Sequence, residues 1–283
     1  MSDLPATEPL LLLDAQHGVL TLTLNRGSQF NALSLEMMSA LQTQLKTVAN
    51  DASVQVVVIA GAGKAFCAGH DLKQMLGIAE PTESAGSAES AESPDQAALQ
   101  ARYQAMFAQC AQLMLQIQNL PQPVIARVHG VATAAGCQLV AMCDLAVASS
   151  NARFAVSGIN VGLFCATPAV ALSRNVSRKQ ALEMLLTGDF IDAPTALARG
   201  LVNRVVPLEE LDAEIARLCL SIQAKPAAVI ASGKQMFYRQ GEMGIAAAYQ
   251  LAAQSMACNM ADPVAQEGVS AFVEKRQPSW RAV

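Results

Sequence analysis

Two loops rich in small residues carry the side chains with the most chemical potential. The first, GAGKAFCAGHD, spans residues 61–71 and ends in His70 and Asp71. The second, HGVATAAGCQ, spans residues 129–138 and leads into an apolar segment. Small residues let a ligand approach backbone N–H groups closely, and such groups stabilise negative charge on a developing oxyanion. The first loop is therefore a candidate ligand site, and we expect a helix to begin after the second, near Ala135.

Other reactive side chains are scattered along the chain. Its seven cysteines are odd in number and lie mostly in apolar segments, which is typical of buried thiols in a reducing compartment. The three histidines lie far apart and the chain has no CxxC pair, so we predict no metal site. The N-terminal sequence lacks Lys and Arg and resembles neither a signal nor a transit peptide, so we expect a cytoplasmic protein.

Composition limits the classes of function. The chain has 283 residues, of which 52% are hydrophobic and 15% charged, enough for a large core. Its net charge is −4 and no run of Lys and Arg exceeds two residues, which argues against a nucleic-acid partner. The longest apolar candidate, residues 139–148, is interrupted by Asp144 and reads as a helix end followed by a strand, so we predict no membrane span.

The elements that position the two loops alternate between strand and helix. Residues 18–25, 54–60 and 124–128 read as strands, and apolar spacing predicts helices over 33–49 and 96–119. Further strands are expected at 145–148, 153–156 and 202–206. This alternation predicts a layered α/β core over residues 1–206. We expect residues 79–95, which are rich in Ser, Ala, Glu and Pro, to form a mobile acidic insertion.

Beyond Pro207 the pattern changes to helical spacing without further convincing strands. We predict that residues 207–283 form a helical oligomerisation region.

Several blocks in order resemble the crotonase (enoyl-CoA hydratase/isomerase) family. They are TLTLNRGSQFNALS, VVVIAGAGKAFCAGHDLK, PVIARVHGVATAAGCQLVAMCDLAVAS, LLTGDFIDAPTALARGLVNRVVP and GVSAFVEKR. The resemblance implies a spiral of ββα units with a C-terminal helical trimerisation region, assembled as a trimer or a dimer of trimers. It also implies a lyase-type role in fatty-acid or acyl-CoA metabolism, with coenzyme A as part of the substrate and no separate cofactor.

The resemblance assigns roles to both loops. It implies that the backbone N–H groups of His70 and Ala135 bind the thioester oxygen of an acyl-CoA. It places the coenzyme along the first loop, and a basic residue of the C-terminal segment, from this or a neighbouring subunit, near the phosphates. The implied coenzyme contacts are Lys64, Ala68, His70, Asp71, Leu72, Lys73 and Lys275.

The chain departs from the family at its acid/base groups. Hydratases of the family use two glutamates, and the corresponding positions are Gln138 and Gly158. An amide accepts no proton at neutral pH and glycine has no side chain. Since each such group contributes about 10²- to 10⁴-fold, ordinary hydration is doubtful and double-bond isomerisation is weakened.

Three side chains are candidate replacements. His70 titrates near neutrality in its ordinary form, and its AGHD loop resembles the decarboxylase branch of the family. The alternative is that only its backbone N–H matters. Cys165 stands where that branch has a tyrosine and is either a reactive thiol or a buried apolar one. Gln138 could position a water molecule or a substrate carboxylate.

The AGHD loop, Gln138 and SGINVGLFCATP together resemble the branch of enoyl-CoA hydratase domain-containing protein 3. Two functions remain open from the sequence. One is an enzyme that forms a thioester enolate, for which decarboxylation of a malonyl-type ester suits best because it needs no base. The other is a non-catalytic homologue that binds acyl-CoA.

Overall fold

The computed structural model describes residues 8–78 and 96–281, so the acidic insertion predicted at 79–95 lies outside the described residues. Within the described ranges, ten strands form two sheets. The larger has the order β1-β2-β3-β5-β7-β10 and the smaller the order β4-β6-β8-β9. The strands are β1 Leu11–Gln16, β2 Val19–Leu24, β3 Val56–Gly61, β4 Ala65–Cys67, β5 Val124–Val128, β6 Val131–Thr133, β7 Leu145–Ser149, β8 Arg153–Ala155, β9 Ile191–Asp192 and β10 Arg204–Val206.

The chain passes repeatedly from one sheet to the other. β3, β5 and β7 are neighbours in the larger sheet, and each is followed within a few residues by β4, β6 or β8 in the smaller one. These neighbours pair in parallel, for example Ile125 opposite Leu145 and Ala132 opposite Phe154. Parallel pairing requires a crossover, and the chain returns by way of helices. The result is a spiral of strand, strand and helix.

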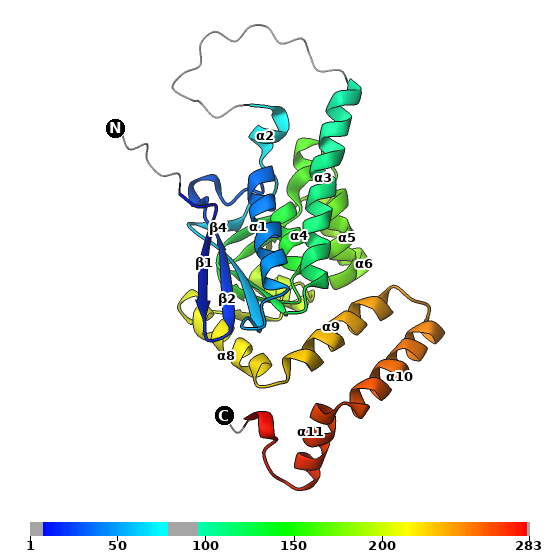
Figure 1. Cartoon of the computed structure of the whole chain (residues 1–283). Coiled ribbons are helices and arrows are strands. Elements are labelled where there is room, and N and C mark those ends of the chain that lie inside the picture. The colour runs from blue at the N-terminus through cyan, green and yellow to red at the C-terminus, as the bar shows by residue number, and fades with distance from the viewer. Residues whose placement is uncertain (1–7, 79–95, 282–283) are drawn as a thin grey trace, which may run out of the picture.

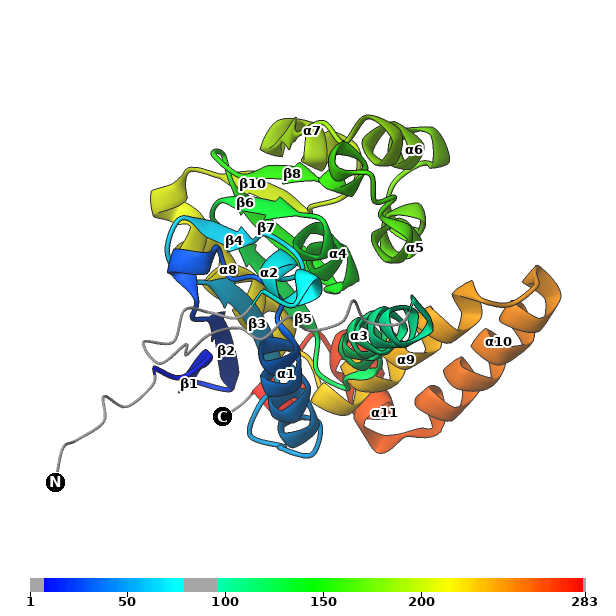
Figure 2. The ribbon, with the colours of Figure 1, turned by 90° about the horizontal axis from the view of Figure 1, so that it is seen from above.

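Helices cover the sheets and form the end of the chain (Figures 1 and 2). The first, α1, begins after Ser34, whose side chain accepts a hydrogen bond from the Met37 N–H and so caps the helix. The helices are α1 Leu35–Val48, α2 Leu72–Leu76, α3 Gln96–Asn119, α4 Ala135–Met142, α5 Ala166–Asn175, α6 Arg178–Thr187, α7 Ala193–Ala198, α8 Leu211–Gln223, α9 Ala227–Gly241, α10 Ile245–Ala261 and α11 Pro263–Val273.

The central strands of the larger sheet are covered on both faces. Val57 and Ile59 of β3 belong to the main core, which also contains apolar residues of α1, α3 and α4. Val56 and Val58 point the other way and pack with Leu211 and other residues of α8. Because both faces are buried, β3 is a continuous apolar run rather than an alternating one. This burial fixes the end of β3, from which the first loop leaves.

Beyond α8 the chain forms an arm that extends from the body (Figure 1). Helix α9 leaves the core, and α10 packs against α9. Within the described residues no single helix has the length and hydropathy of a membrane span. The bent pair 208–223 and 227–241 does pass that test together, by length and composition.

A buried ion pair attaches α9 to the core. Lys234 Nζ lies 2.6 Å from Asp144 Oδ2 and also donates to the carbonyl oxygens of Ile117 and Gln122. The other Asp144 oxygen accepts from the Tyr238 hydroxyl, and Oδ2 also accepts from the Val124 N–H at 2.7 Å. Asp144 therefore holds the start of β5 and the arm together.

The structure confirms the predicted α/β core, and the helical spacing beyond residue 207 appears as α8 to α11. Helices predicted at 33–49 and 96–119 are α1 and α3, and the strand at 124–128 is β5. Four strands were not predicted, namely β1, β4, β6 and β9. The last three have two or three residues, too few for a recognisable alternation.

Candidate functional site

The two small-residue loops meet where β4 ends and α4 begins. Gly69 has a φ of +93°, and a Cβ there would lie 2.8 Å from Ala134 Cβ and 3.0 Å from the Ala135 nitrogen. A Cβ on Gly136 would overlap the carbonyl oxygen of Cys67. Only glycine permits this approach at both positions. The structure therefore brings His70, which follows Gly69, next to the first turn of α4.

Two backbone N–H groups at this junction make no backbone hydrogen bond with any described residue. The bridge between Leu33 and His70 uses the N–H groups of Leu33 and Asp71, and the His70 N–H takes no part in it. Ala135 is the first residue of α4, where an N–H has no partner within the helix. The preceding Ala134 has a φ of +50°, a strained value for a residue with a side chain. The strained backbone at Ala134 therefore lies directly beside the N–H donors of His70 and Ala135.

An enclosed cavity of about 270 Å³ lies beside these donors. Its walls come from the β4–α2 turn, from α3 and from the segment that joins β8 to α5. Its described lining contains neither a carboxylate nor a Lys or Arg side chain. The residues that line it are Ala68, His70, Leu72, Met75, Phe107, Ala134, Ala135, Ser157, Gly158, Val161, Leu163, Phe164, Cys165, Ala166, Thr167 and Pro168.

The His70 ring belongs to the wall of this cavity. It contacts the Phe107 ring edge to face, with centroids 5.4 Å apart and an angle of 81° between the planes. Its Nε2 is buried and has no hydrogen-bond partner among the described residues. Burial lowers the pKa of His70 to about 4. The expectation that this imidazole titrates near neutrality is therefore wrong, because nothing nearby compensates for its desolvation.

Gly158 and Cys165 lie together on another wall. A Cβ on Gly158 would lie 2.7 Å from Cys165 Sγ and 2.5 Å from the Leu163 carbonyl oxygen, so the thiol fills the space of a side chain at 158. Burial raises the pKa of the Cys165 thiol, and a hydrogen bond from the Gly158 backbone opposes that shift. The Ser157 side chain, which also lines the cavity, pairs with Thr133 at 2.9 Å between their hydroxyl oxygens.

Gln138 is absent from the cavity lining. Its side chain is 4% exposed, and its Oε1 accepts from the Cys110 thiol at 3.9 Å. The prediction that Gln138 could position a water molecule or a substrate carboxylate is wrong for this conformation, because α4 directs the side chain towards α3. Its neighbour Cys137 is fully buried in the core.

The coenzyme contacts implied by the resemblance are only partly brought together. Ala68, His70 and Leu72 line the cavity, while Asp71 and Lys73 line a separate hollow of about 640 Å³. Asp71 also caps α2 through the Gln74 N–H. The same hollow contains Arg26, which sequence reasoning missed although it follows a predicted strand.

Two of the predicted lysines lie elsewhere. Lys64 is exposed between β3 and β4 and lines neither hollow. Lys275 follows α11, which lies at the opposite end of the molecule from α2 (Figure 1). Within one chain Lys275 does not join the other coenzyme candidates. A contribution from a neighbouring subunit stays a prediction.

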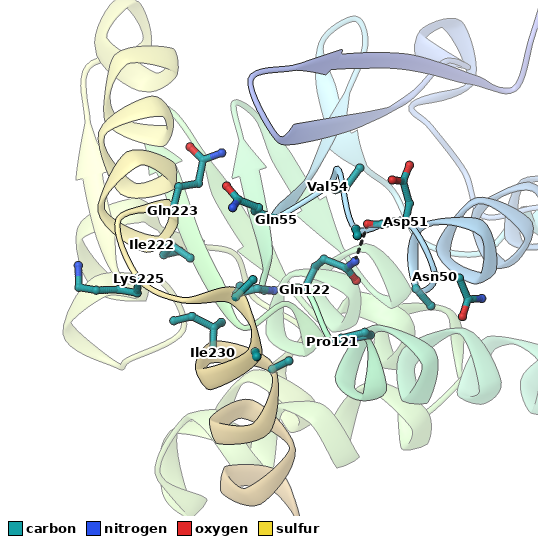
Figure 3. A pocket seen from close by; sticks show the side chains of 16 residues that line it. Asn50, Asp51, Val54, Gln55, Pro121, Gln122, Ile222, Gln223, Lys225 and Ile230 are labelled. Carbon is teal, nitrogen blue, oxygen red and sulfur yellow. Dashed lines mark hydrogen bonds between the residues drawn. The ribbon is translucent and has the colours of Figure 1, made fainter. Parts of the chain in front are cut away.

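A further hollow of about 300 Å³, partly open to solvent, lies at the root of the arm (Figure 3). It is formed by the turn after α1, the turn before β5 and the corner between α8 and α9. Gln122 donates from Nε2 to Val48 O at 2.9 Å, while its Oε1 is buried without a partner among the described residues. The hollow lies where β3 and β5 begin, whereas the His70 and Ala135 donors follow the second strands of their units.

The described residues offer little support for a metal site or for a reactive thiolate outside the cavity. These contain no group of three or more His, Cys, Asp or Glu side chains that could hold a metal ion. Six of the seven cysteines are buried, as predicted, and Cys258 is exposed. Burial raises the pKa of Cys67, Cys110 and Cys137 to about 12 each, so these thiols stay protonated.

Comparison with known proteins identifies the fold that carries this site. A family model described as enoyl-CoA hydratase/isomerase matches residues 14–282. The chain belongs to the enoyl-CoA hydratase/isomerase family. A solved structure of an enoyl-CoA hydratase from Mycobacterium smegmatis is 58% identical, with a TM-score of 0.87 over 97% of this chain and 100% of that chain. The crotonase-type spiral inferred from the sequence is confirmed.

The comparisons also support the predicted branch of the family. Enoyl-CoA hydratase domain-containing protein 3 of Xenopus laevis is 45% identical over 96% of this chain and 86% of its own length. The solved human protein of that name is 40% identical, with a TM-score of 0.86 over 96% of this chain and 100% of that chain.

These relatives overturn one prediction. The Xenopus protein and its counterparts from mouse, rat and human are all named mitochondrial. The expectation of a cytoplasmic protein is contradicted by them, because neither buried thiols nor an N-terminus without basic residues distinguishes among reducing compartments.

Proposed function

We propose that this chain binds an acyl-CoA thioester and stabilises its enolate between the N–H groups of His70 and Ala135. The enolate arises by loss of CO₂ from a malonyl-type ester. Coenzyme A enters as part of the substrate, and the role falls within acyl-CoA metabolism.

The observation that carries the proposal is the pair of open N–H donors at the edge of the 270 Å³ cavity. Preorganised donors in a site sheltered from water stabilise an oxyanion at no cost of rearrangement. The strained Ala134 and the tightly packed Gly69 fix both donors before any ligand binds. The cavity itself accepts the acyl group.

The lining favours decarboxylation over hydration. Hydration requires a group that activates water and a group that exchanges a proton with carbon, and the described lining contains no carboxylate for either task. The His70 imidazole is a weak base because burial lowers its pKa to about 4. Loss of CO₂ forms an enolate without a base. The apolar wall also offers a substrate carboxylate no cation, which leaves the ionised ester poorly solvated relative to the departing CO₂.

The nucleotide end of the coenzyme is proposed to lie in the hollow that contains Lys73 and Arg26. This hollow adjoins the cavity through the β4–α2 turn, since Asp71 lines one and His70 and Leu72 line the other. Its lining holds these two cations together with the carboxylates of Glu8, Glu36 and Asp71. The Arg26 guanidinium donates to the carbonyl oxygens of Glu8, Pro9 and Asn25, so Lys73 is the cation that we propose for a phosphate of the ligand.

The arm supports an oligomer. Helices α9 to α11 leave large apolar side chains uncovered, including Ile245, Tyr249, Met256 and Phe272, each more than 70% exposed. An apolar surface of this kind needs a partner. We propose that further copies of the chain cover it, as a trimer or a dimer of trimers. Sedimentation equilibrium tests this, and a monomer would contradict it.

The function is tested by incubating the purified protein with a pool of malonyl-, methylmalonyl-, enoyl- and simple acyl-CoA thioesters and following every species by mass spectrometry. Decarboxylation removes about 44 mass units from a malonyl-type ester. A gain of about 18 units on an enoyl ester would instead show hydration and contradict the proposed reaction. Survival of every thioester, with binding intact, would identify an acyl-CoA-binding homologue without catalysis.

A further inference from the structure

A decarboxylated thioester needs a proton at its α-carbon, and this cavity has few groups that can supply one. The enolate left by CO₂ carries its charge on oxygen and carbon, and product forms only when a proton reaches the carbon. Among the described lining residues, the side chains with an exchangeable proton are His70, Ser157, Cys165 and Thr167.

These four side chains differ as acids. The neutral His70 ring and the two hydroxyl groups are much weaker acids than a thiol, even a thiol whose pKa is raised by burial. The Ser157 hydroxyl is also engaged with Thr133. Cys165 is therefore the strongest acid in the described lining.

The surroundings of Cys165 suit a group that gives up a proton and recovers it. Cys165 precedes the first residue of the ten-residue helix α5, so a thiolate formed there lies at a helix N-terminus. The Gly158 backbone stabilises the same charge through a hydrogen bond. Cys165 is 7% exposed, so the thiol itself has little contact with bulk water in the folded chain.

The cavity wall is shaped around the thiol. A Cβ on Gly158 would meet Cys165 Sγ at 2.7 Å and the Leu163 carbonyl oxygen at 2.5 Å, so a larger residue at 158 would displace the sulfur. The turn that encloses it is held by the Leu163 N–H donating to the Gly158 carbonyl at 3.0 Å. The same cavity is lined by His70, whose buried Nε2 has no hydrogen-bond partner among the described residues.

We propose that Cys165 is the catalytic residue that protonates the α-carbon of the enolate, which rests on the proposed decarboxylation. The bond between the α-carbon and the carboxylate carbon breaks and CO₂ leaves. The electron pair of the broken bond stays on the substrate and forms the enolate. The enolate then takes the thiol proton, a carbon–hydrogen bond forms, and Cys165 becomes a thiolate. Water returns the proton to sulfur, so no oxidant or reductant is consumed.

The test uses the full-length protein with methylmalonyl-CoA in ²H₂O. The thiol exchanges with solvent, so each turnover places one deuterium on the α-carbon of the propionyl product. A fixed donor on one side gives a single configuration, which ²H NMR of a chiral derivative reports. We expect one configuration from the wild type and from the control Cys258→Ala, whose cysteine is exposed on α10.

Cys165→Ala is expected to give a nearly equal mixture of configurations, and product formation about 10²-fold slower than wild type if protonation limits the rate. Thioester affinity, measured in parallel, should stay within about threefold of wild type, which separates proton transfer from loss of folding. A single configuration from Cys165→Ala at the wild-type rate would overturn the role of Cys165 and leave the proposed function standing. Absence of CO₂ release by the wild type would overturn both.

Discussion

The two sides of the candidate acyl cavity are built on different principles. On one side the β4–α2 turn and the start of α4 present backbone N–H groups, held by Gly69, Gly136 and the strained Ala134. On the other side the segment from Ser157 to Cys165 presents side chains, among which a thiol fills the space beside a glycine. In our proposal the first side binds the oxyanion and the second handles the proton.

This difference teaches which part of such a site is sensitive to which kind of change. A backbone donor survives any substitution that preserves the path of the chain, so its vulnerable positions are those where a Cβ does not fit. A side-chain acid is lost by a single replacement. The predictions below probe each side in turn, from the largest expected effect to the smallest.

Gly136→Ala should have the largest effect, because the new Cβ would overlap the Cys67 carbonyl oxygen and push the start of α4 away from the β4–α2 turn. We expect turnover of the responsive thioester to fall about 10²- to 10³-fold, as for loss of an oxyanion donor. Steady-state kinetics measures this.

The matched control is Gly233→Ala in α9, another helical glycine, where a Cβ would find no atom within 4 Å. Its activity should be unchanged and its stability slightly raised. Equal behaviour of the two alanine variants would contradict the steric account of the oxyanion side.

Gly158→Glu tests the opposite side by restoring a carboxylate. The added side chain competes with Cys165 Sγ and the Leu163 carbonyl for the same space, so we expect no hydration of an enoyl-CoA and a loss of decarboxylation of about tenfold or more. The double variant Gly158→Glu with Cys165→Gly removes the thiol. Efficient hydration by the single variant, detected by mass spectrometry, would show that the space at 158 is more adaptable than the structure indicates.

His70→Gln should have a smaller effect, which we expect on the free energy of unfolding and which depends on pH. Burial lowers the pKa of His70 to about 4 from an ordinary 6.5, so between these values the unfolded chain binds more protons than the folded one. The free energy of unfolding contributed by His70 is therefore present above pH 6.5 and falls as the pH drops towards 4.

Urea unfolding across this range should show a steeper loss of stability for the wild type than for His70→Gln. Identical slopes would show that the ring is solvated in the folded protein. Above pH 6.5 the wild-type turnover should be independent of His70 titration.

Lys73→Ala should have the smallest effect on activity and binding. This lysine is exposed and lies at the edge of the hollow of about 640 Å³ that Asp71 and Arg26 also line, which we call the outer hollow. A single exposed charge contributes little, so we expect the Kd for an acyl-CoA to rise about two- to fivefold with kcat unchanged. Lys46→Ala, in the last turn of α1, is the control and should leave the Kd unaltered. Isothermal titration calorimetry measures both, and equal affinities would exclude a coenzyme contact by Lys73.

Sequence reasoning located the two backbone loops because their signals are local, and their role at an oxyanion stays a prediction. Glycines, small residues and a helix start are visible in the AGHD and ATAAGCQ segments, and the structure brings both together. The side-chain side was harder. The direction of Gln138 depends on how α4 packs against α3, and the depressed pKa of His70 depends on burial against Phe107, neither of which follows from spacing.

Long-range contacts escaped prediction for the same reason. Asp144 stood out in the sequence only as a charge that interrupts an apolar run. It accepts from the Val124 N–H, and its buried partner Lys234 lies 90 residues away on the arm. Arg26 in the outer hollow was missed because its chemistry depends on a neighbour from another turn of the spiral.

The most direct test of the central claim is the ¹³C NMR signal of an acyl-CoA labelled at the thioester carbonyl, bound to the wild type and to Gly136→Ala. Two backbone donors at this oxygen polarise the carbonyl, so the account predicts a downfield shift on binding to the wild type and its reduction in the variant. An unshifted carbonyl signal in a saturated wild-type complex would contradict an oxyanion site at His70 and Ala135.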